Sequence, residues 1–200
     1  MKKMLRAAVL VAAVLLVLPF SSCGKKYTEE EIKSAAAELI EASYEINEIF
    51  FGEGLPGVEP EVEDVMRYLL IAEESPYHTE DEVKAAARAV YSENYCSLLF
   101  ERAFVGFTLD ETDDDGIDTT QLVDARYLNY NDELVILPID EDDIMKLDRT
   151  YDTDSIKVLK QKSGTAIISV QSYVNGEKSD EVTLNMIITE KGWRLDSPTY

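Results

Sequence analysis

The feature that most constrains the fold is a change of hydrophobic period near Ala125, where apolar residues begin to recur at every second position. This alternation is the period of a β-strand with one buried face. Asn175-Gly176 separates two long alternating runs, and both residues tolerate the positive φ of a type I′ hairpin turn. This pattern therefore predicts an antiparallel meander in the last third of the chain. Its apolar face comprises Ala166, Ile168, Val170, Ser172, Val174, Val182, Leu184, Met186 and Ile188.

Shorter alternating runs flank this hairpin. Arg126–Tyr130 and Leu134–Leu137 lie on either side of the turn residues Asn131-Asp132, and Ile156–Lys160 precedes the turn at Ser163-Gly164. Trp193 and Leu195 alternate on a final short strand after Lys191-Gly192. We expect these strands to join the same meander.

The half of the chain before Ala125 has a helical period instead. Thr28 with Glu31, and Thr79 with Glu82, match the capping box that starts a helix, and Ser92 is a candidate cap for a third helix. Val65–Ala72 reads as a short strand between the first two helices. The apolar stripe of the first helix, which ends near Phe51, comprises Ile32, Ala36, Leu39, Ser43, Ile46 and Phe50. Helices covering one face of an antiparallel sheet predict a single α+β domain over residues 28–200.

The first 23 residues have the pattern of a leader. Lys2, Lys3 and Arg6 precede an apolar run of signal-peptide length, Ala7–Leu18, which is too short for an ordinary membrane span. Phe20-Ser21-Ser22-Cys23 then resembles the lipobox of bacterial lipoproteins, departing from it at Phe20, where Leu is usual. The resemblance implies a signal peptide over residues 1–22 that is cut before Cys23. It also implies a lipid on the Cys23 thiol and a short tether over residues 23–27.

These features predict a protein anchored by membrane lipid at the extracytoplasmic face of a bacterial cell membrane. Two alternatives are a plain secretory signal, in which Cys23 is incidental, and a disulfide with Cys96, the only other cysteine. Cys96 lies inside an apolar helical pattern, where a free thiol usually behaves as a small hydrophobic residue.

The charge of the chain excludes one class of partner. The leader holds three of the 19 basic residues and none of the 40 acidic ones, so the chain after it carries a formal charge of −24. Such a charge argues against nucleic acid and against adsorption to anionic lipid. It suits either simple solubility or a partner with a basic surface.

Asp110–Asp118 is the densest acidic stretch and reads as a turn. Clustered carboxylates favour Ca²⁺, so we compared the stretch with the EF-hand loop. With Gly116 at the required glycine, the apolar eighth position is Asp118 and the bidentate twelfth is Leu122, so an EF-hand is rejected. A solvated loop is the default interpretation, and an irregular cation site is the alternative.

The common catalytic patterns are missing from the sequence. His78 is the only histidine, which leaves a single base for a Ser-His-Asp triad or for a Cys96 nucleophile. The sequence contains no Gly-x-Ser-x-Gly elbow, no phosphate-binding glycine loop and too few ligands for a zinc site. We therefore expect a protein without enzymatic activity and without a cofactor.

Two resemblances give a more specific expectation. Helices followed by a meander that ends in Gly192-Trp193-Arg194-Leu195 look like the NTF2-like, or cystatin-like, cone folds. Three stretches are also similar to the IseA-type inhibitors of DL-endopeptidases, and together they cover about a quarter of the chain after the leader. These stretches are Ile49–Pro56, Tyr77–Phe104 and Gly192–Tyr200.

The second resemblance implies a non-enzymatic inhibitor of the cell-wall hydrolases that cleave peptidoglycan stem peptides, acting by occlusion of the active-site groove. It carries over no inhibitory residue. We predict that the acidic stretch makes the contact with the hydrolase, through Asp110, Glu111, Asp113, Asp114 and Asp115. The alternative is an NTF2-like module that binds a small apolar ligand inside its cone.

Overall fold

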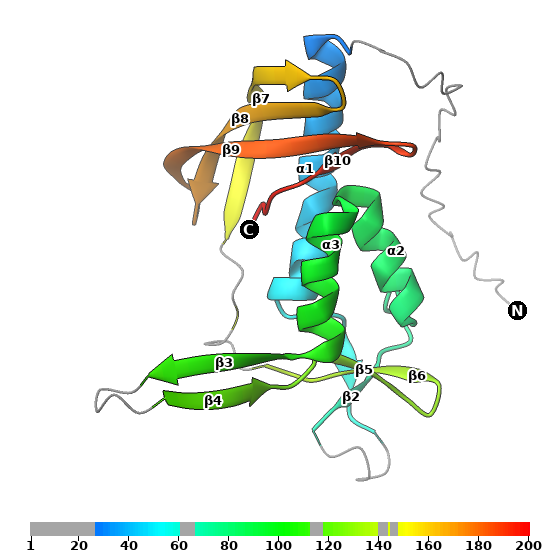
Figure 1. Ribbon diagram of the computed structural model, residues 1–200. Helices are drawn as coiled ribbons and strands as arrows, with labels where there is room; N and C mark the ends of the chain where they lie inside the picture. The colour runs from blue at the N-terminus through cyan, green and yellow to red at the C-terminus, as the bar shows by residue number, and fades with distance from the viewer. Residues whose placement is uncertain (1–26, 61–66, 113–117, 140–143, 145–147) are drawn as a thin grey trace, which may run out of the picture.

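The computed structural model describes residues 27–60, 67–112, 118–139, 144 and 148–200 (Figure 1). Three α-helices and two four-stranded antiparallel sheets make up most of this part, together with a two-stranded ribbon. The prediction of an α+β fold is confirmed. The cone of the NTF2-like folds is not confirmed by this arrangement.

Helix α1, Glu29–Phe51, is the long axis around which the other elements lie. Thr28 Oγ1 accepts from the backbone N–H of Glu31 while the Glu31 carboxylate accepts from the Thr28 N–H, which confirms the predicted capping box. The 23 residues extend over about 35 Å. The predicted apolar stripe is confirmed, because each of its members is buried: Ile32, Ala36, Leu39, Ser43, Ile46 and Phe50.

Two short helices, α2 (Glu80–Val90) and α3 (Glu93–Phe100), pack beside α1. Their predicted caps are confirmed, since Thr79 accepts from the N–H of Glu82 and Ser92 accepts from that of Tyr95. A π-helical turn, η2 (Glu101–Val105), follows α3. The helical spacing of Tyr95, Cys96, Leu98 and Leu99 predicts that all four share the apolar face of α3, and this is wrong for Leu98, whose side chain is 60% exposed.

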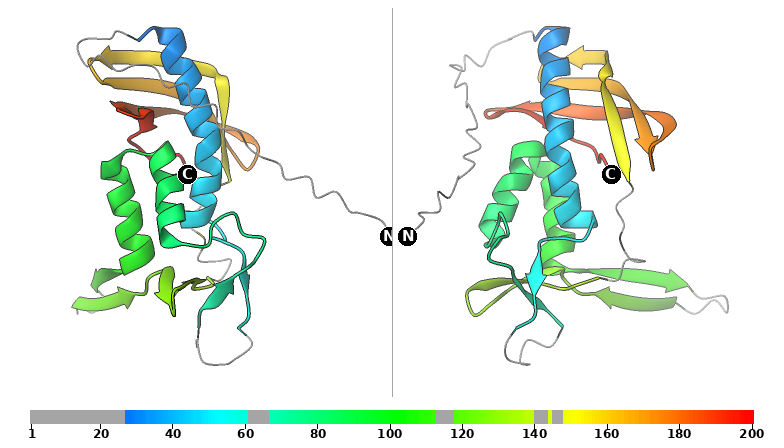
Figure 2. Two further views of the ribbon diagram at one scale, coloured as in Figure 1. Left: turned by 90° about the vertical axis from the view of Figure 1, so that its right-hand side faces the viewer. Right: turned by 180° about the vertical axis from the view of Figure 1, so that it is seen from behind.

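The C-terminal sheet has the order β10-β9-β8-β7 and is the predicted meander. It comprises β7 (Arg149–Lys162), β8 (Thr165–Val174), β9 (Glu177–Thr189) and β10 (Gly192–Leu195). Asn175 and Gly176 have φ of 52° and 74°, as the predicted hairpin turn requires. Figure 2 shows α1 running along one face of this sheet. Side chains on that face, such as Ile168 and Leu184, are fully buried.

A second sheet, which we call the distal sheet, lies at the C-terminal end of α1. Its order is β1-β2-β6-β5, and its strands are β1 (Gly57–Val58), β2 (Leu69–Ile71), β5 (Tyr127–Tyr130) and β6 (Glu133–Ile136). The expectation that all strands after Ala125 share one meander was wrong. Strand β6 pairs with β2, which precedes α2 in the chain, and the two strands are joined through Leu70↔Val135.

The acidic stretch is part of a two-stranded ribbon formed by β3 (Phe107–Thr112) and β4 (Asp118–Val123). Six antiparallel pairs join the two strands, from Phe107↔Val123 to Thr112↔Asp118. The prediction of a turn over the whole of Asp110–Asp118 was therefore wrong at its ends, since residues 110–112 are strand. Residues 113–117 lie outside the described residues.

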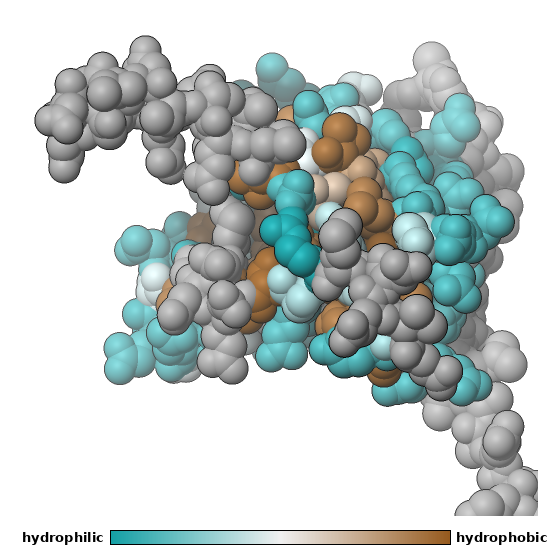
Figure 3. Space-filling model, turned by 90° about the horizontal axis from the view of Figure 1, so that it is seen from below, coloured by the Kyte–Doolittle hydropathy of each residue, from teal (hydrophilic) through white to brown (hydrophobic). Residues whose placement is uncertain are grey.

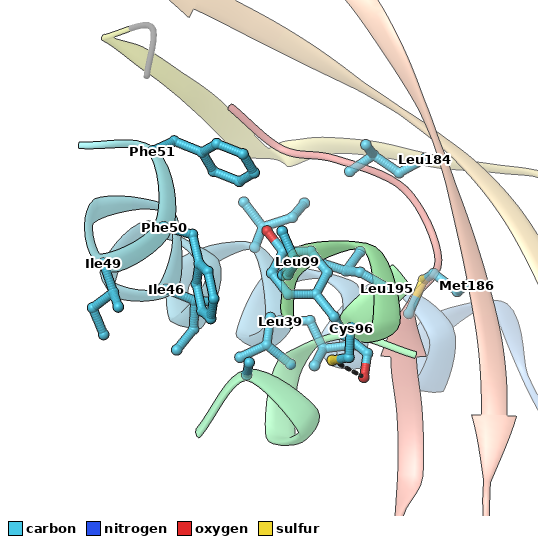
Figure 4. Packing of buried hydrophobic residues seen from close by; sticks show 14 of the residues in the cluster. Leu39, Ile46, Ile49, Phe50, Phe51, Cys96, Leu99, Leu184, Met186 and Leu195 are labelled. Atoms are coloured by element: carbon cyan, nitrogen blue, oxygen red, sulfur yellow. Dashed lines mark hydrogen bonds between the residues drawn. The ribbon is translucent and has the colours of Figure 1, made fainter. Parts of the chain in front are cut away.

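One buried hydrophobic cluster connects the two sheets through the helices (Figure 4). Ile46 and Phe50 of α1, Leu99 of α3 and Leu184 and Met186 of β9 point toward one another in this view. The same cluster includes Tyr127 and Ile136 of the distal sheet. In the part of the chain that the structure describes, no helix has the length and apolar character needed to span a membrane.

Candidate functional site

The β3–β4 ribbon projects away from the helices (Figures 1 and 2). In the described part of the chain its two strands pair only with each other. An isolated two-stranded hairpin is marginally stable in water, so such a ribbon is held mainly at its root. There Gly106 has φ of 84°, and a Cβ on it would lie 2.4 Å from the Val123 carbonyl oxygen. Only glycine therefore fits at the point where the ribbon leaves η2.

The predicted contact residues divide into two groups. Asp110 and Glu111 occupy consecutive positions of β3, in register with Thr120 and Thr119 of β4. Asp113, Asp114 and Asp115 lie outside the described residues, as does Cys23. The ribbon was not predicted, because its strands are rich in acidic and hydroxyl residues. The available signal is short: Phe107 and Leu109 alternate with the polar residues Thr108 and Asp110.

The ribbon and the distal sheet lie at the same end of the molecule, because only residues 124–126 separate β4 from β5. The start of β5 is fixed to the end of α1. The Tyr127 hydroxyl donates to the Ile49 carbonyl at 2.8 Å and accepts from the Leu55 N–H at 3.1 Å. Arg126 Nη2 donates to the Gly52 carbonyl at 2.9 Å, which satisfies an acceptor at the helix end. The ribbon is thus mounted on a rigid base.

The N-terminal end of α1 lies against the C-terminal sheet. Gln161 Nε2, at the end of β7, donates to the Tyr27 carbonyl at 2.9 Å, and the Tyr27 ring packs edge-on against Trp193 at 5.1 Å. The chain therefore enters the domain beside the C-terminal sheet, and the length of α1 separates this entry point from the ribbon.

The Cys96 thiol has no catalytic surroundings. Its side chain is fully buried, and burial raises the pKa of the thiol from 9.0 to about 12. Its sulfur lies 3.8 Å from the Tyr91 carbonyl oxygen, as the dashed line in Figure 4 marks. His78 is exposed, and its backbone N–H donates to the Glu82 carboxylate as part of the α2 cap. The prediction of a buried, hydrophobic Cys96 is confirmed.

A buried polar network holds the C-terminal segment against α1. Asn47 Nδ2 donates to Thr199 Oγ1 at 2.9 Å, and Thr199 donates to Ser43 Oγ at 2.8 Å. The Tyr91 hydroxyl donates to Asn47 Oδ1 at 2.8 Å and lies 2.7 Å from Thr199 Oγ1. Tyr200 stacks on Phe51 with ring centroids 3.8 Å apart. Since each of these groups has a partner inside the protein, the network is a structural clasp for the segment.

The described residues contain no group of three or more His, Cys, Asp or Glu side chains that could hold a metal ion. No protein-family model matches the chain, and no curated protein is significantly similar to it. The β3–β4 ribbon on its fixed base is the strongest candidate for a functional site in the part of the chain that the structure describes.

Proposed function

We propose that this chain is a lipid-anchored protein of the bacterial cell surface that inhibits a peptidoglycan DL-endopeptidase without catalysing a reaction. The observation that supports this function best is the projecting β3–β4 ribbon. A two-stranded ribbon that stands clear of the rest of the fold can enter an active-site groove. The inhibitor would act by occupying the groove, so no chemical step is needed.

Charge supports the same function. Strand β3 carries Asp110 and Glu111, and Asp113, Asp114 and Asp115 follow it in the sequence, within a chain whose formal charge after the leader is −24. Complementary charge accelerates encounter with a basic partner and orients the two proteins. The inhibitor is therefore expected to associate faster at low salt than at high salt.

The position of the ribbon also suits an anchored inhibitor. A lipid on Cys23 would hold the start of α1, at Glu29, within six residues of chain, about 20 Å at full extension, from the membrane surface. The ribbon lies at the other end of α1, about 35 Å farther along the helix axis. The anchored domain would then present its ribbon toward the cell wall, where the substrate of the hydrolase lies.

The test uses the chain without its leader, residues 24–200, added to a DL-endopeptidase that digests purified peptidoglycan. The expected result is stoichiometric loss of lysis, followed as turbidity. Lysis that proceeds unchanged at a tenfold molar excess of the chain would contradict the function. Digestion of peptidoglycan by the chain alone would show an enzymatic activity instead.

A matched pair of variants tests the ribbon. The first replaces Asp110, Glu111, Asp113, Asp114 and Asp115 by their amides, and it should weaken inhibition about tenfold and flatten its salt dependence. The control makes the same change of charge at exposed carboxylates elsewhere: Glu41, Glu73, Glu74, Glu177 and Glu190. Equal losses in the two variants would assign the effect to net charge and remove the ribbon from the contact.

A further inference from the structure

The strands of the distal sheet are apolar at consecutive positions. Leu69-Leu70-Ile71 forms all of β2, and Leu134-Val135-Ile136 forms most of β6. An antiparallel strand with one face in water normally alternates apolar and polar residues, while continuous apolar runs are typical of strands covered on both faces. The distal sheet thus has the sequence of a sheet that is buried on both sides.

The register separates the two faces. Leu69↔Ile136 and Tyr127↔Ile136 place Leu69, Ile136 and Tyr127 in one row, and all three pack in or against the hydrophobic core. The adjacent positions form a second row on the opposite side, because successive side chains of a strand point to opposite faces. This row crosses all four strands in the order Val58, Leu70, Val135 and Leu128. We call the side that carries it the outer face.

The outer face is accessible at its two ends. Val58 is 46% exposed and Leu128 is 39% exposed, whereas Leu70 is half-buried and Val135 is buried between them. Tyr130, two residues beyond Leu128 on the same strand, is 41% exposed. Figure 3 views the molecule from below, onto the distal sheet, and shows hydrophobic side chains gathered on this side. Exposed apolar side chains that lie near one another mark a binding site more often than a solvated face.

Acidic residues border the outer face. Glu59 follows β1, Asp132 lies in the turn between β5 and β6, and Glu133 begins β6; all three are exposed. An apolar centre with a charged rim is the usual layout of a protein interface. The matching partner has an apolar patch bordered by Lys and Arg. A second copy of this chain is the poorer fit, because it repeats the same acidic rim and the same large negative charge.

We infer that the outer face binds the surface of the inhibited enzyme next to its groove, with the ribbon in the groove. This inference rests on the proposed function and names a second part of its contact. The ribbon and the outer face belong to one end of the molecule, and residues 124–126 connect them. The ribbon would contribute charge and steering, while the outer face would contribute most of the apolar contact.

The test compares two double variants of the chain without its leader in the same turbidity assay. Val58→Ser with Leu128→Ser removes apolar contact from the outer face. Leu98→Ser with Leu159→Ser is the control, because these side chains are 60% and 57% exposed on α3 and β7. We expect the first variant to inhibit at least about tenfold more weakly and the control to change inhibition less than twofold. All four substitutions are at exposed positions, so thermal unfolding midpoints should shift by about 2 °C or less.

The outcomes separate this inference from the function on which it rests. If the unmodified chain fails to inhibit, the proposed function fails. If the unmodified chain inhibits and the outer-face variant inhibits equally well, the function stands and the inference is overturned. Sedimentation of the free chain gives a further check. A monomer is expected, and a dimer that only the outer-face variant disrupts would assign the face to a second copy of the chain.

Discussion

The two four-stranded sheets of this protein differ in the side that does not contact the helices. On the C-terminal sheet, that side carries polar residues in register, such as Ser169↔Thr183 and Gln171↔Glu181. Some of them bond across strands: Ser169 Oγ and Lys157 Nζ both donate to Glu181 Oε1, at 3.0 and 2.9 Å. On the distal sheet the corresponding side carries an apolar row instead.

The two sheets therefore use the side away from the helices differently. Both bury one face against the same hydrophobic cluster, so both contribute to a stable core. The other face of the C-terminal sheet carries exposed polar residues such as Thr183 and Glu181. The other face of the distal sheet is apolar, with Val135 buried at its centre and Val58 and Leu128 exposed at its ends. These exposed ends are the part that the proposed partner would cover.

The largest expected effect tests whether the two inner faces are equivalent and the outer face is dispensable for folding. Ile168→Ala and Ile136→Ala should each lower the free energy of unfolding by about 2–5 kcal/mol, because both side chains are buried in the cluster. Leu128→Ala should lower it by less than about 0.5 kcal/mol. Urea denaturation measures all three. A loss at Leu128 as large as that at Ile136 would mean that the outer face is core.

The next largest effect is a loss of stability at high pH, which tests whether water is excluded from Cys96 and Tyr91 in the core. Burial raises the pKa of Cys96 from 9.0 and of Tyr91 from 10.0, in each case to about 12. The unfolded chain releases these protons at lower pH than the folded chain. Stability from this source is therefore complete below pH about 9 and is lost as the pH rises toward 12, by at most about 1.4 kcal/mol per pH unit for each group.

Urea denaturation at pH 8, 10 and 11 measures this loss. Tyr91→Phe serves as the control, because it removes one of the titrating groups and should make the decline with pH shallower. A free energy of unfolding that stays constant from pH 8 to pH 11 would show that these groups are open to solvent.

The smallest expected effect tests the clasp that joins the end of the chain to α1. Thr199→Val keeps the shape of the side chain but removes the hydroxyl that accepts from Asn47 and donates to Ser43. A buried amide N–H without a partner costs about 1–3 kcal/mol, so the free energy of unfolding should fall by that amount. Thr199→Ser keeps the hydroxyl and should lose less. Equal losses in both variants would assign the effect to the methyl group and not to the network.

Several parts of the fold were predictable because their causes are local. The capping boxes at Thr28 and Thr79 each lie within four residues, and the hairpin turn at Asn175-Gly176 depends on two. The apolar stripe of α1 follows from helical spacing alone. These features require no information about the rest of the chain, since the hydrogen bonds and backbone angles that define them form between near neighbours.

For the candidate site, the sequence showed which acidic residues are present but not how they are arranged. The contact role of the acidic stretch stays a prediction, and Asp110 and Glu111 were assigned to a turn because no local signal showed that residues 107–112 pair with 118–123. The outer face was missed as well. Its signal was present in the consecutive apolar residues of β2 and β6, but the meaning of that signal depends on what covers each side.

Local sequence patterns are enough to give the α+β class, the starts of the three helices and the meander of the C-terminal sheet. Packing of the folded chain is needed to pair β6 with β2, and to bring the Tyr91 hydroxyl to Thr199, which is 108 residues away in the chain. Packing also leaves Val58 and Leu128 of the distal sheet exposed while it buries Val135 between them. Such contacts join segments far apart in sequence, so their partners are chosen by the packing of the whole chain and not by the residues beside them.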